Sequence, residues 1–445
     1  MPGFNRYRRV LAVVASLLVV AMVIFAMRFY RNPQARWNAL NGKIEKLTSD
    51  GKYEAATPAA QKALALAQTK FGERDVRAAT SLENLAEIYS KQGKGVEAEQ
   101  LAHRALDIAQ AGSGSDNPEV ARALYTMAEV QVDENQLAKA EPFCREALEI
   151  QQRILPPDDP TLGHSLHLMA YIYQMQFKTD KYSEVEADYQ QALTIREKAF
   201  GPDDLLIAPT AGMLGRFYFT QARWSEAEPL LAREISLDAR RLGPDHADVR
   251  MSLAMLASAQ QDLKEYEKAE ESRKRMLEIE KKNKTADGPV QVSSTYGVLS
   301  QLEHLQGNDT QAEVYAEQSV EALGSGAADS WREPALIRLA ELYRDEGKNA
   351  EAEKNYKKLL EFAATHSDLV RERTTLDELI RLLDVEGKAA ESEPYHKRRV
   401  GIADQMHDYA GGVAARVAYA AFLRRVNRAS EADEMEKQAN TMSRY

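Results

Sequence analysis

The sequence predicts an all-α fold, in which an array of stacked helix pairs is preceded by one apolar helix. Ala, Glu, Leu, Lys and Arg dominate the 445 residues, and no long β-branched run follows residue 25, which favours helix. From residue 53 onward a short signature returns every 40–45 residues, as in chains built from structural repeats. Residues 10–27 form an uninterrupted apolar run.

The apolar run at 10–27 holds eighteen residues without a charge, and Ser16 is its only polar side chain. As a helix it would be about 27 Å long, just short of the hydrocarbon core of a bilayer at roughly 30 Å. A cleaved signal peptide is the alternative, but the run ends without an Ala-x-Ala site and offers only Val-Val-Ala at 19–21. We therefore expect a basic tail at 1–9, an uncleaved transmembrane helix at 10–27 and a linker at 28–33.

Charge gives an expected orientation and argues against one class of partner. Three arginines lie on each side of the apolar run, so the positive-inside count is balanced. The short, triply basic tail is the part harder to move across a membrane, so we expect the large C-terminal body outside the cytoplasm, periplasmic in a bacterium. A cytosol-facing adaptor is the alternative. The chain carries −10, and six arginines without an acid in residues 1–37 leave −16 for the rest, which argues against nucleic acid as the main partner.

The repeat signature is an aromatic or small residue followed three positions later by Ala and often Glu, as in YEAA at 53–56 and WSEAE at 224–228. Its key residue advances in steps of 42, 42, 45, 42, 42, 43, 40, 40 and 40. The longest step coincides with three residues inserted in the turn at 175–180. The key residues are Ala56, Ala98, Ala140, Val185, Ala227, Ala269, Ala312, Ala352, Ser392 and Ala432.

Each unit is expected to be two amphipathic helices joined by a tight turn. In the second unit Leu82, Leu85, Ala86 and Tyr89 form one helical stripe, and Ala98 starts a second stripe after the turn KQGKG. Small residues let the two helix backbones approach closely. A pair this small cannot bury its own stripe, so it must stack on its neighbours. The predicted close-packing positions are Ala86, Ala98, Ala128, Ala140, Ala170, Gly215, Ala227, Ala257, Ala269, Ala340 and Ala352.

The repeat resembles the tetratricopeptide repeat (TPR), in particular the 42-residue type of kinesin light chains. The resemblance rests on residues 198–249, where a GPDH-type turn, a small residue and an AEP segment follow in family order. It implies a right-handed α-solenoid. We expect strong repeats over 34–285. Over 286–445 the spacing survives without the GPDH turn, so divergent TPR-like repeats and a C-terminal capping helix are expected there.

The Gly-Pro-Asp turns are interpreted as hinges. Gly201 and Gly243 stand where a second helix is expected to end, and the prolines that follow them prevent its continuation. The next Asp or His can then cap the following helix. A turn that recurs once per repeat with changing residues is architectural, so we do not interpret it as a metal-binding or catalytic loop.

Other polar clusters are candidates for sites of chemistry. His164 and His167 have a spacing that could share a metal, but zinc needs three or four ligands and no paired cysteines occur. The acidic pairs at 158–159 and 203–204 lie at helix starts, where acids favour the helix dipole. The segments GSGSD at 112–116 and GSG at 324–326 are interpreted as inter-repeat turns, and Cys144 as a small core residue. We expect no catalytic site, no metal and no cofactor.

The TPR resemblance implies that the first helices line a concave groove where peptides bind. We therefore predict a non-catalytic scaffold for a protein or peptide partner, without a small-molecule substrate. A metal-dependent binder or enzyme built on His164 and His167 is the alternative. If those histidines are exposed, an acidic peptide should bind better as the pH falls toward 6. The predicted groove residues are Arg122, Tyr125, Glu129, Val132, His164, His167, Tyr171, Gln174, Pro209, Gly212, Arg216, Phe219 and His304.

Overall fold

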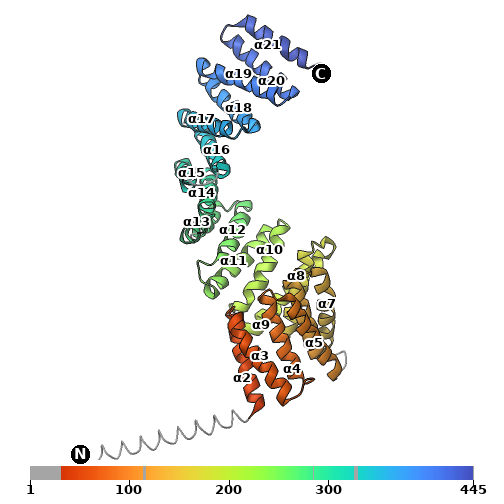
Figure 1. The fold of residues 1–445 in the computed structure, drawn as a ribbon. Helices are drawn as coiled ribbons and strands as arrows, with labels where there is room; N and C mark the ends of the chain where they lie inside the picture. Colours follow the sequence, from red (N-terminus) through yellow and green to blue (C-terminus); the bar gives the residue numbers. More distant parts are fainter. Residues whose placement is uncertain (1–31, 114–116, 284, 325–328, 444–445) are drawn as a thin grey trace, which may run out of the picture. The chain divides into compact units, whose positions relative to one another are not determined.

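The structure is a computed structural model that describes residues 32–113, 117–283, 285–324 and 329–443. Within these residues it contains twenty α-helices, two short 3-10 helices and no strand, so the predicted all-α fold is confirmed there (Figure 1). The chain divides into two compact units, Met1–Gln221 and Ala222–Tyr445.

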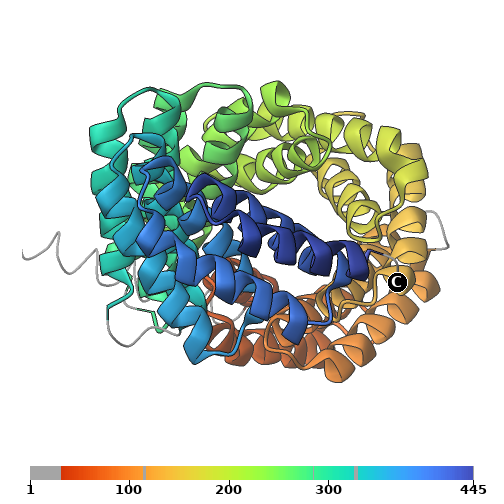
Figure 2. The ribbon, with the colours of Figure 1, turned by 90° about the horizontal axis from the view of Figure 1, so that it is seen from above.

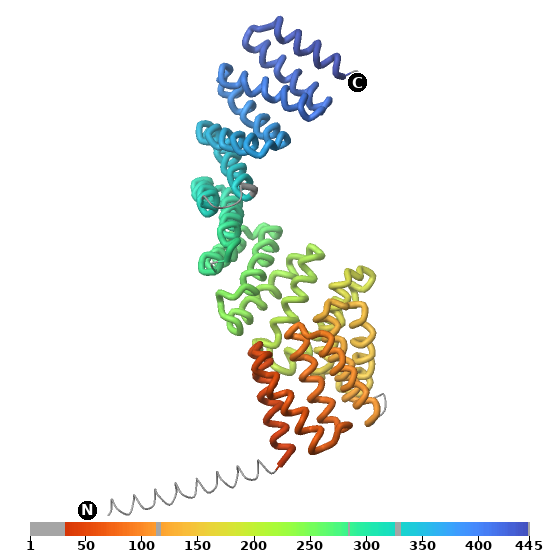
Figure 3. Tube along the Cα trace, in the orientation of Figure 1, coloured from red at the N-terminus to blue at the C-terminus, as the bar shows by residue number. Residues whose placement is uncertain are grey.

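The helices follow one another as pairs, a first and a second helix in each repeat, and Figure 3 traces the chain through them. In the first unit they are α2 (Pro33–Ser49), α3 (Tyr53–Lys70), α4 (Val76–Lys91), α5 (Gly95–Ser113), α6 (Pro118–Asp133), α7 (Leu137–Ile154), α8 (Pro160–Met175), η1 (Thr179–Lys181), α9 (Tyr182–Phe200), η2 (Leu205–Ile207) and α10 (Ala208–Thr220). In the second unit they are α11 (Trp224–Arg241), α12 (Ala247–Asp262), α13 (Tyr266–Lys282), α14 (Gly288–Leu305), α15 (Asp309–Ala322), α16 (Asp329–Asp345), α17 (Asn349–Thr365), α18 (Leu369–Val385), α19 (Ala389–Gln405), α20 (Tyr409–Arg425) and α21 (Ala429–Met442).

The first helices of the first unit form its inner side. Each helix from α2 to α10 contacts the next one along the chain, and the first helices α2, α4, α6, α8 and α10 also contact one another across the repeat boundaries. Elements on the inside of a curved stack approach each other most closely. Figure 2 shows the first unit curving as an arc from α2 (red) to α10 (yellow-green). The first helices therefore line the concave side of this unit.

The backbone of the turns carries the same repeat as the sequence. The turn inside each pair holds a residue with φ between +51° and +80°, and these residues advance in steps of 42, 42, 42, 45, 42, 43, 40, 40 and 40. The longest step contains η1, which accommodates the three inserted residues. The predicted repeat is thus present along the whole described array. The residues are Gly51, Gly93, Asn135, Phe177, Ala222, Lys264, Gly307, Gly347, Gly387 and Asn427.

Replacing Phe177 by glycine should raise the free energy of unfolding by about 1 kcal/mol. Phe177 has φ 53° and its side chain is exposed, so its ring contributes little packing while its Cβ strains a left-handed backbone. Denaturant unfolding measures the change. The reciprocal change Gly93→Phe, at φ 71° in the equivalent turn, should destabilise the chain, and equal effects of the two changes would contradict the argument.

The turns between repeats are hinges, as predicted. Gly201 ends α9 with φ 91° and ψ 156°, a backbone conformation that is open only to glycine. The Asp204 carboxylate then accepts from the amide of Leu206, and His246 Nδ1 accepts from the amide of Asp248. In the 40-residue repeats the hinge is shorter, and the Asp408 carboxylate caps α20 directly.

Small residues lie in the core where the two helices of each pair cross. All ten key residues of the repeat signature are fully buried, from Ala56 to Ala432. In the second repeat Ala86 and Ala98 share one cluster with Met127 and Val130 of the next first helix. The eleven predicted close-packing positions are likewise buried, including Gly215. Each apolar stripe is therefore covered by the partner helix of its own pair and by the neighbouring repeat together.

The prediction of a single-pass membrane protein is corrected by the structure. No helix in the described parts of the chain is long and apolar enough to cross a membrane, because their apolar residues form stripes that pack on neighbouring helices. A single-pass N-terminal anchor with an extracytoplasmic body is therefore not supported by the described residues. The run at 10–27 that prompted the prediction lies outside the described residues.

Candidate functional site

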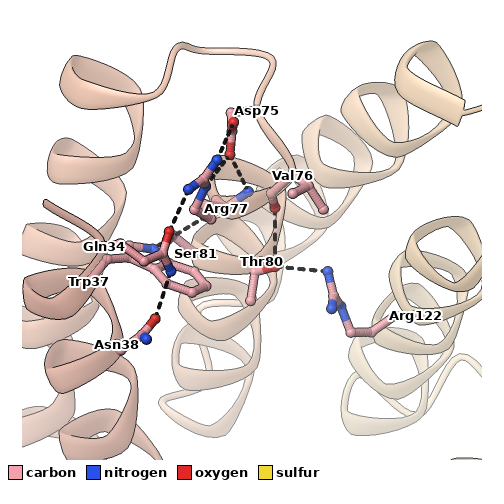
Figure 4. Close-up of polar contacts among 9 residues, drawn as sticks. All are labelled: Gln34, Trp37, Asn38, Asp75, Val76, Arg77, Thr80, Ser81 and Arg122. Carbon is pink, nitrogen blue, oxygen red and sulfur yellow. Dashed lines mark hydrogen bonds and ion pairs between the residues drawn. The ribbon is translucent and has the colours of Figure 1, made fainter.

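Polar side chains link successive first helices on the concave side of the first unit. Between α2 and α4, Arg77 donates to the Gln34 amide oxygen, and Trp37 Nε1 donates to Ser81 Oγ over 2.9 Å (Figure 4). Asn84 also donates to Asn41 Oδ1 over 2.7 Å. These partners are 43 or 44 residues apart, which is close to one repeat length, so equivalent positions of neighbouring repeats meet across the boundary.

Arg122 belongs to this set of links. Its Nη2 donates to Thr80 Oγ1 over 2.8 Å, as Figure 4 shows, and its Nε pairs with the carboxylate of Glu83. Glu83 is 4% exposed, and this burial raises its pKa although the charge of Arg122 opposes the shift. Arg122, predicted as a ligand-binding residue, is therefore engaged in holding α4 against α6.

The next turns of α6 are also engaged within the chain. Lys91 Nζ and Ser90 Oγ each donate to the carboxylate of Asp133 over 2.7 Å. The phenol of Tyr125 donates to Glu129 over 2.9 Å. Burial, followed by repulsion from Glu87, raises the pKa of Glu129 to about 7. The predicted groove residues Tyr125 and Glu129 thus form a pair with each other.

The following first helix, α8, presents a different surface. His164, His167, Tyr171 and Gln174 lie on successive turns and are all half-buried. We call these four residues the α8 face. Tyr171 has no hydrogen-bond partner among the described residues. The amide oxygen of Gln174 accepts from the buried phenol of Tyr189 over 3.0 Å, which leaves its NH2 group as a donor.

The proton of His167 is placed by its neighbours. Thr210 Oγ1 accepts from Arg196 Nη1 over 2.6 Å and lies 3.2 Å from His167 Nδ1. The hydroxyl has one proton and two acceptor positions, so it can donate to Nδ1 while it accepts from the guanidinium. We assign this arrangement, in which neutral His167 carries its proton on Nε2. The imidazole also packs edge-on against Tyr189, with ring centroids 5.5 Å apart. Thr210 and Tyr189 hold the imidazole in place, and in the assigned tautomer its Nε2–H is a hydrogen-bond donor.

Both histidines of the α8 face stay neutral near pH 6. Burial, followed by the charge of Arg196, lowers the pKa of His164 to about 4 and that of His167 to about 3. The expected strengthening of acidic-peptide binding as the pH falls toward 6 required exposed imidazoles. That expectation is corrected, because the two rings do not gain charge in that range.

The structure separates the remaining predicted groove residues. On α10, Arg216 and Phe219 are half-buried and Pro209 is exposed, whereas Gly212 is buried and offers no surface, which corrects its assignment to the groove. Val132 is half-buried on α6. His304 lies in the second unit, exposed, with Nδ1 2.8 Å from the carboxylate of Asp309.

Two features of the site were missed by sequence reasoning. Arg196 comes from the second helix α9, a class of helix to which only packing was assigned, yet it bonds Thr210 of α10. No sequence signal marks it. The pairs Thr80–Arg122 and His167–Thr210, by contrast, are 42 and 43 residues apart. Comparing polar residues one repeat apart would have found them.

Among the described residues no group of three or more His, Cys, Asp and Glu side chains is placed to hold a metal ion. Cys144 is fully buried, its Sγ lies 3.6 Å from the carbonyl oxygen of Ser165, and burial raises its pKa. The predicted turns GSGSD and GSG lie largely outside the described residues, at 114–116 and 325–328.

Stacked helix pairs with a polar concave side define an α-helical repeat protein of the scaffold type. Sequence models of the tetratricopeptide repeat match residues 38–111, 77–143 and 210–282, and related models match 163–205 and 333–366. Together these matches span more than half of the chain, so it belongs to the tetratricopeptide repeat family. No curated protein sequence matches the chain.

Solved structures resemble the chain in fold alone. Kinesin-light-chain-like TPR repeats from Podosopora anserina are 22% identical over 46% of this chain and 97% of that one, with a TM-score of 0.39. BtubC from P. vanneervenii is 19% identical over 52% and 90%, with a TM-score of 0.44. The apo form of RapI is 12% identical over 82% and 97%, with a TM-score of 0.47.

Proposed function

We propose that the chain is a non-catalytic scaffold that binds an extended peptide segment of a protein partner on the concave side of its first unit, with the α8 face as the main contact. One observation carries the proposal. Arg122, Tyr125 and Glu129 of α6 are engaged by other side chains of the chain. The α8 face instead combines a tyrosine without a hydrogen-bond partner with two side chains, His167 and Gln174, that bond to residues of α10 and α9.

The chemistry of the α8 face fits an extended backbone. Peptide carbonyls in an extended segment need donors, and His167 Nε2 and the NH2 group of Gln174 are donors whose partners behind them fix their orientation. Tyr171 lies between them along the helix and supplies a large ring with few rotatable bonds, a property of residues that dominate binding energy. Ordering these groups on binding therefore costs little conformational entropy.

Replacing Tyr171 by alanine should weaken peptide binding by about 1–3 kcal/mol and leave the melting temperature unchanged. Peptides selected from a random display library on the full chain serve as ligands, and titration calorimetry measures their affinity. Glu146→Ala, at an exposed position of the second helix α7, is the matched control and should bind as the parent does. If Tyr171→Ala binds the peptides as tightly as the parent while Glu146→Ala loses affinity, the binding surface lies on the second helices and the proposal is wrong.

A further inference from the structure

A groove of about 630 Å³ lies between the first half of α2 and the second half of α3, and we call it the α2–α3 groove. Its apolar lining comes from Ala39 and Leu40 of α2 and from Ala65 and Leu66 of α3. Ala39 and Ala65 are exposed, and Leu40 is half-buried. No residue of the α8 face lines this groove, so it is a second and separate surface.

In the next repeats a helix covers the surface that is equivalent to this part of α2. One repeat length of 42 residues after Ala39 and Leu40 stand Ser81 and Leu82 of α4, which are both 0% exposed. Leu64 of α3, the second helix of the preceding repeat, packs against the cluster that contains Leu82. No helix precedes α2 among the described residues, so the surface is open there. The equivalent positions on α6 and α8 are also buried, and they are Ala123, Leu124, Ser165 and Leu166.

Three cations line the α2–α3 groove beside its apolar residues. They are Arg36, Lys62 and Lys70, and no acidic residue of the described chain lines the groove with them. Among the described residues none of the three side chains forms a hydrogen bond or an ion pair. The whole chain carries −10, yet residues 32–70 hold six basic and three acidic residues. An open apolar surface with a basic rim favours a partner that is apolar in the middle and acidic at its edges.

We propose that the α2–α3 groove binds an amphipathic helix of a partner protein, with its apolar stripe on the groove and acidic side chains against Arg36, Lys62 and Lys70. The helical shape of the ligand follows from the next repeats, where a second helix covers the equivalent surface. The acidic character follows from the three cations. Residues 1–31 fit less well, because they contain five arginines and no acid, and like charges would then meet.

Two synthetic peptides of the length of α3, 18 residues, test the charge and the shape of the ligand. Both carry the same leucine stripe at helical spacing, flanked by glutamates in one peptide and by lysines in the other. Fluorescence anisotropy of the labelled peptides measures their affinity for the full chain. The glutamate peptide should bind about tenfold more tightly than the lysine peptide, and added salt should reduce this difference.

Substitutions in the groove should change binding in a directed way. Lys62→Glu should reduce the preference for the glutamate peptide, whereas Lys43→Glu, at an exposed position of α2 outside the groove, should keep it. Ala65→Glu puts a charge on the apolar lining and should weaken the glutamate peptide about tenfold. Ala55→Glu, exposed on the same helix outside the groove, should bind as the parent does. All four positions are exposed, so the melting temperature should not change.

Failure of the glutamate peptide to bind, equal binding of the two peptides, or binding that survives Ala65→Glu would overturn the proposal. Two other occupants of the groove have their own signatures, and each would also contradict it. Residues 10–27 of the chain itself are the occupant if the glutamate peptide binds only after Met22→Asp, since Met22 stands 42 residues before Leu64. A second copy is the occupant if sedimentation shows self-association that Ala65→Glu abolishes.

The peptide site proposed on the α8 face can fail independently of this groove. Tyr171→Ala should leave the affinity for the glutamate peptide unchanged, because Tyr171 does not line the groove. Ala65→Glu should likewise leave the affinity for the peptides selected by display unchanged if those peptides bind the α8 face. A loss of glutamate-peptide binding in Tyr171→Ala would place that peptide on the α8 face and overturn the groove proposal.

Discussion

Replacing Ala98 by arginine is expected to lower the free energy of unfolding by about 3 kcal/mol or more, because the change overpacks a closed site and buries a charge without a partner. Ala98 is fully buried in a cluster with Ala86, Ala102 and Met127, so the new side chain has no path to solvent without separating α4 from α5. Since each repeat is stabilised mainly by its neighbours, unfolding should begin in the second and third repeats.

The matched control for this change lies two residues away. Val96 is on the same helix and 69% exposed, so Val96→Arg should change the stability by less than about 0.5 kcal/mol. Urea unfolding followed by circular dichroism measures both variants, and hydrogen exchange locates the repeats that open first. Equal stability of Ala98→Arg and Val96→Arg would mean that the assigned helix crossing is wrong.

Replacing Arg122 by methionine is expected to destabilise the chain by about 2 kcal/mol at pH 8 and by much less at pH 5. The change leaves the buried carboxylate of Glu83 without its cation. The Arg122 side chain is 42% exposed, so we expect less than the loss of a fully buried pair.

The pH dependence follows from the direction of the Glu83 shift. Burial raises the pKa of Glu83 and Arg122 opposes that rise, so removing Arg122 raises the pKa further. A carboxyl group whose folded-state pKa is raised binds its proton more tightly in the folded state. Folding is then favoured at low pH, and stability is lost as the pH rises through the folded pKa. The variant should therefore lose more stability than the parent between pH 5 and pH 8.

The double variant Arg122→Met with Glu83→Gln provides the control. Without an ionisable group at position 83, most of the lost stability should return and the additional pH dependence should disappear. Unfolding curves for the parent and the two variants at pH 5 and pH 8 give the required free energies. A pH-independent loss in Arg122→Met would show that packing of the side chain, rather than its charge, holds α4 against α6.

The repeat was predictable because it rests on local and periodic constraints. Backbone turns with positive φ recur in the same steps of 40–45 residues as the alanines of the signature, since each helix pair needs one tight turn and one small residue at its crossing. The hinges at Gly201 and Gly243 follow from the same logic, because a helix end and a cap are properties of a few adjacent residues. These features required no knowledge of distant contacts.

The candidate site was predicted only in part. Spacing placed His164, His167 and Tyr171 on one side of α8, which is a property of a single helix. Spacing within one helix could not show that Arg122 pairs with Glu83, because these two residues lie 39 positions apart in the sequence and on different helices. Nor could it give the charge of the histidines, since burial and the nearby Arg196 lower their pKa values only in the folded array.

By itself the sequence determined the class of fold, the length of each repeat and the small residues at the helix crossings, because these follow from helix periodicity and close packing within one pair. Only the tertiary structure decided which concave polar groups bond one another and which are left without partners. Arg196 illustrates the reason: it lies on a second helix, and stacking of the fourth repeat on the fifth brings it to Thr210, buried and without an acid. Such an arrangement depends on contacts between repeats, which no single helix encodes.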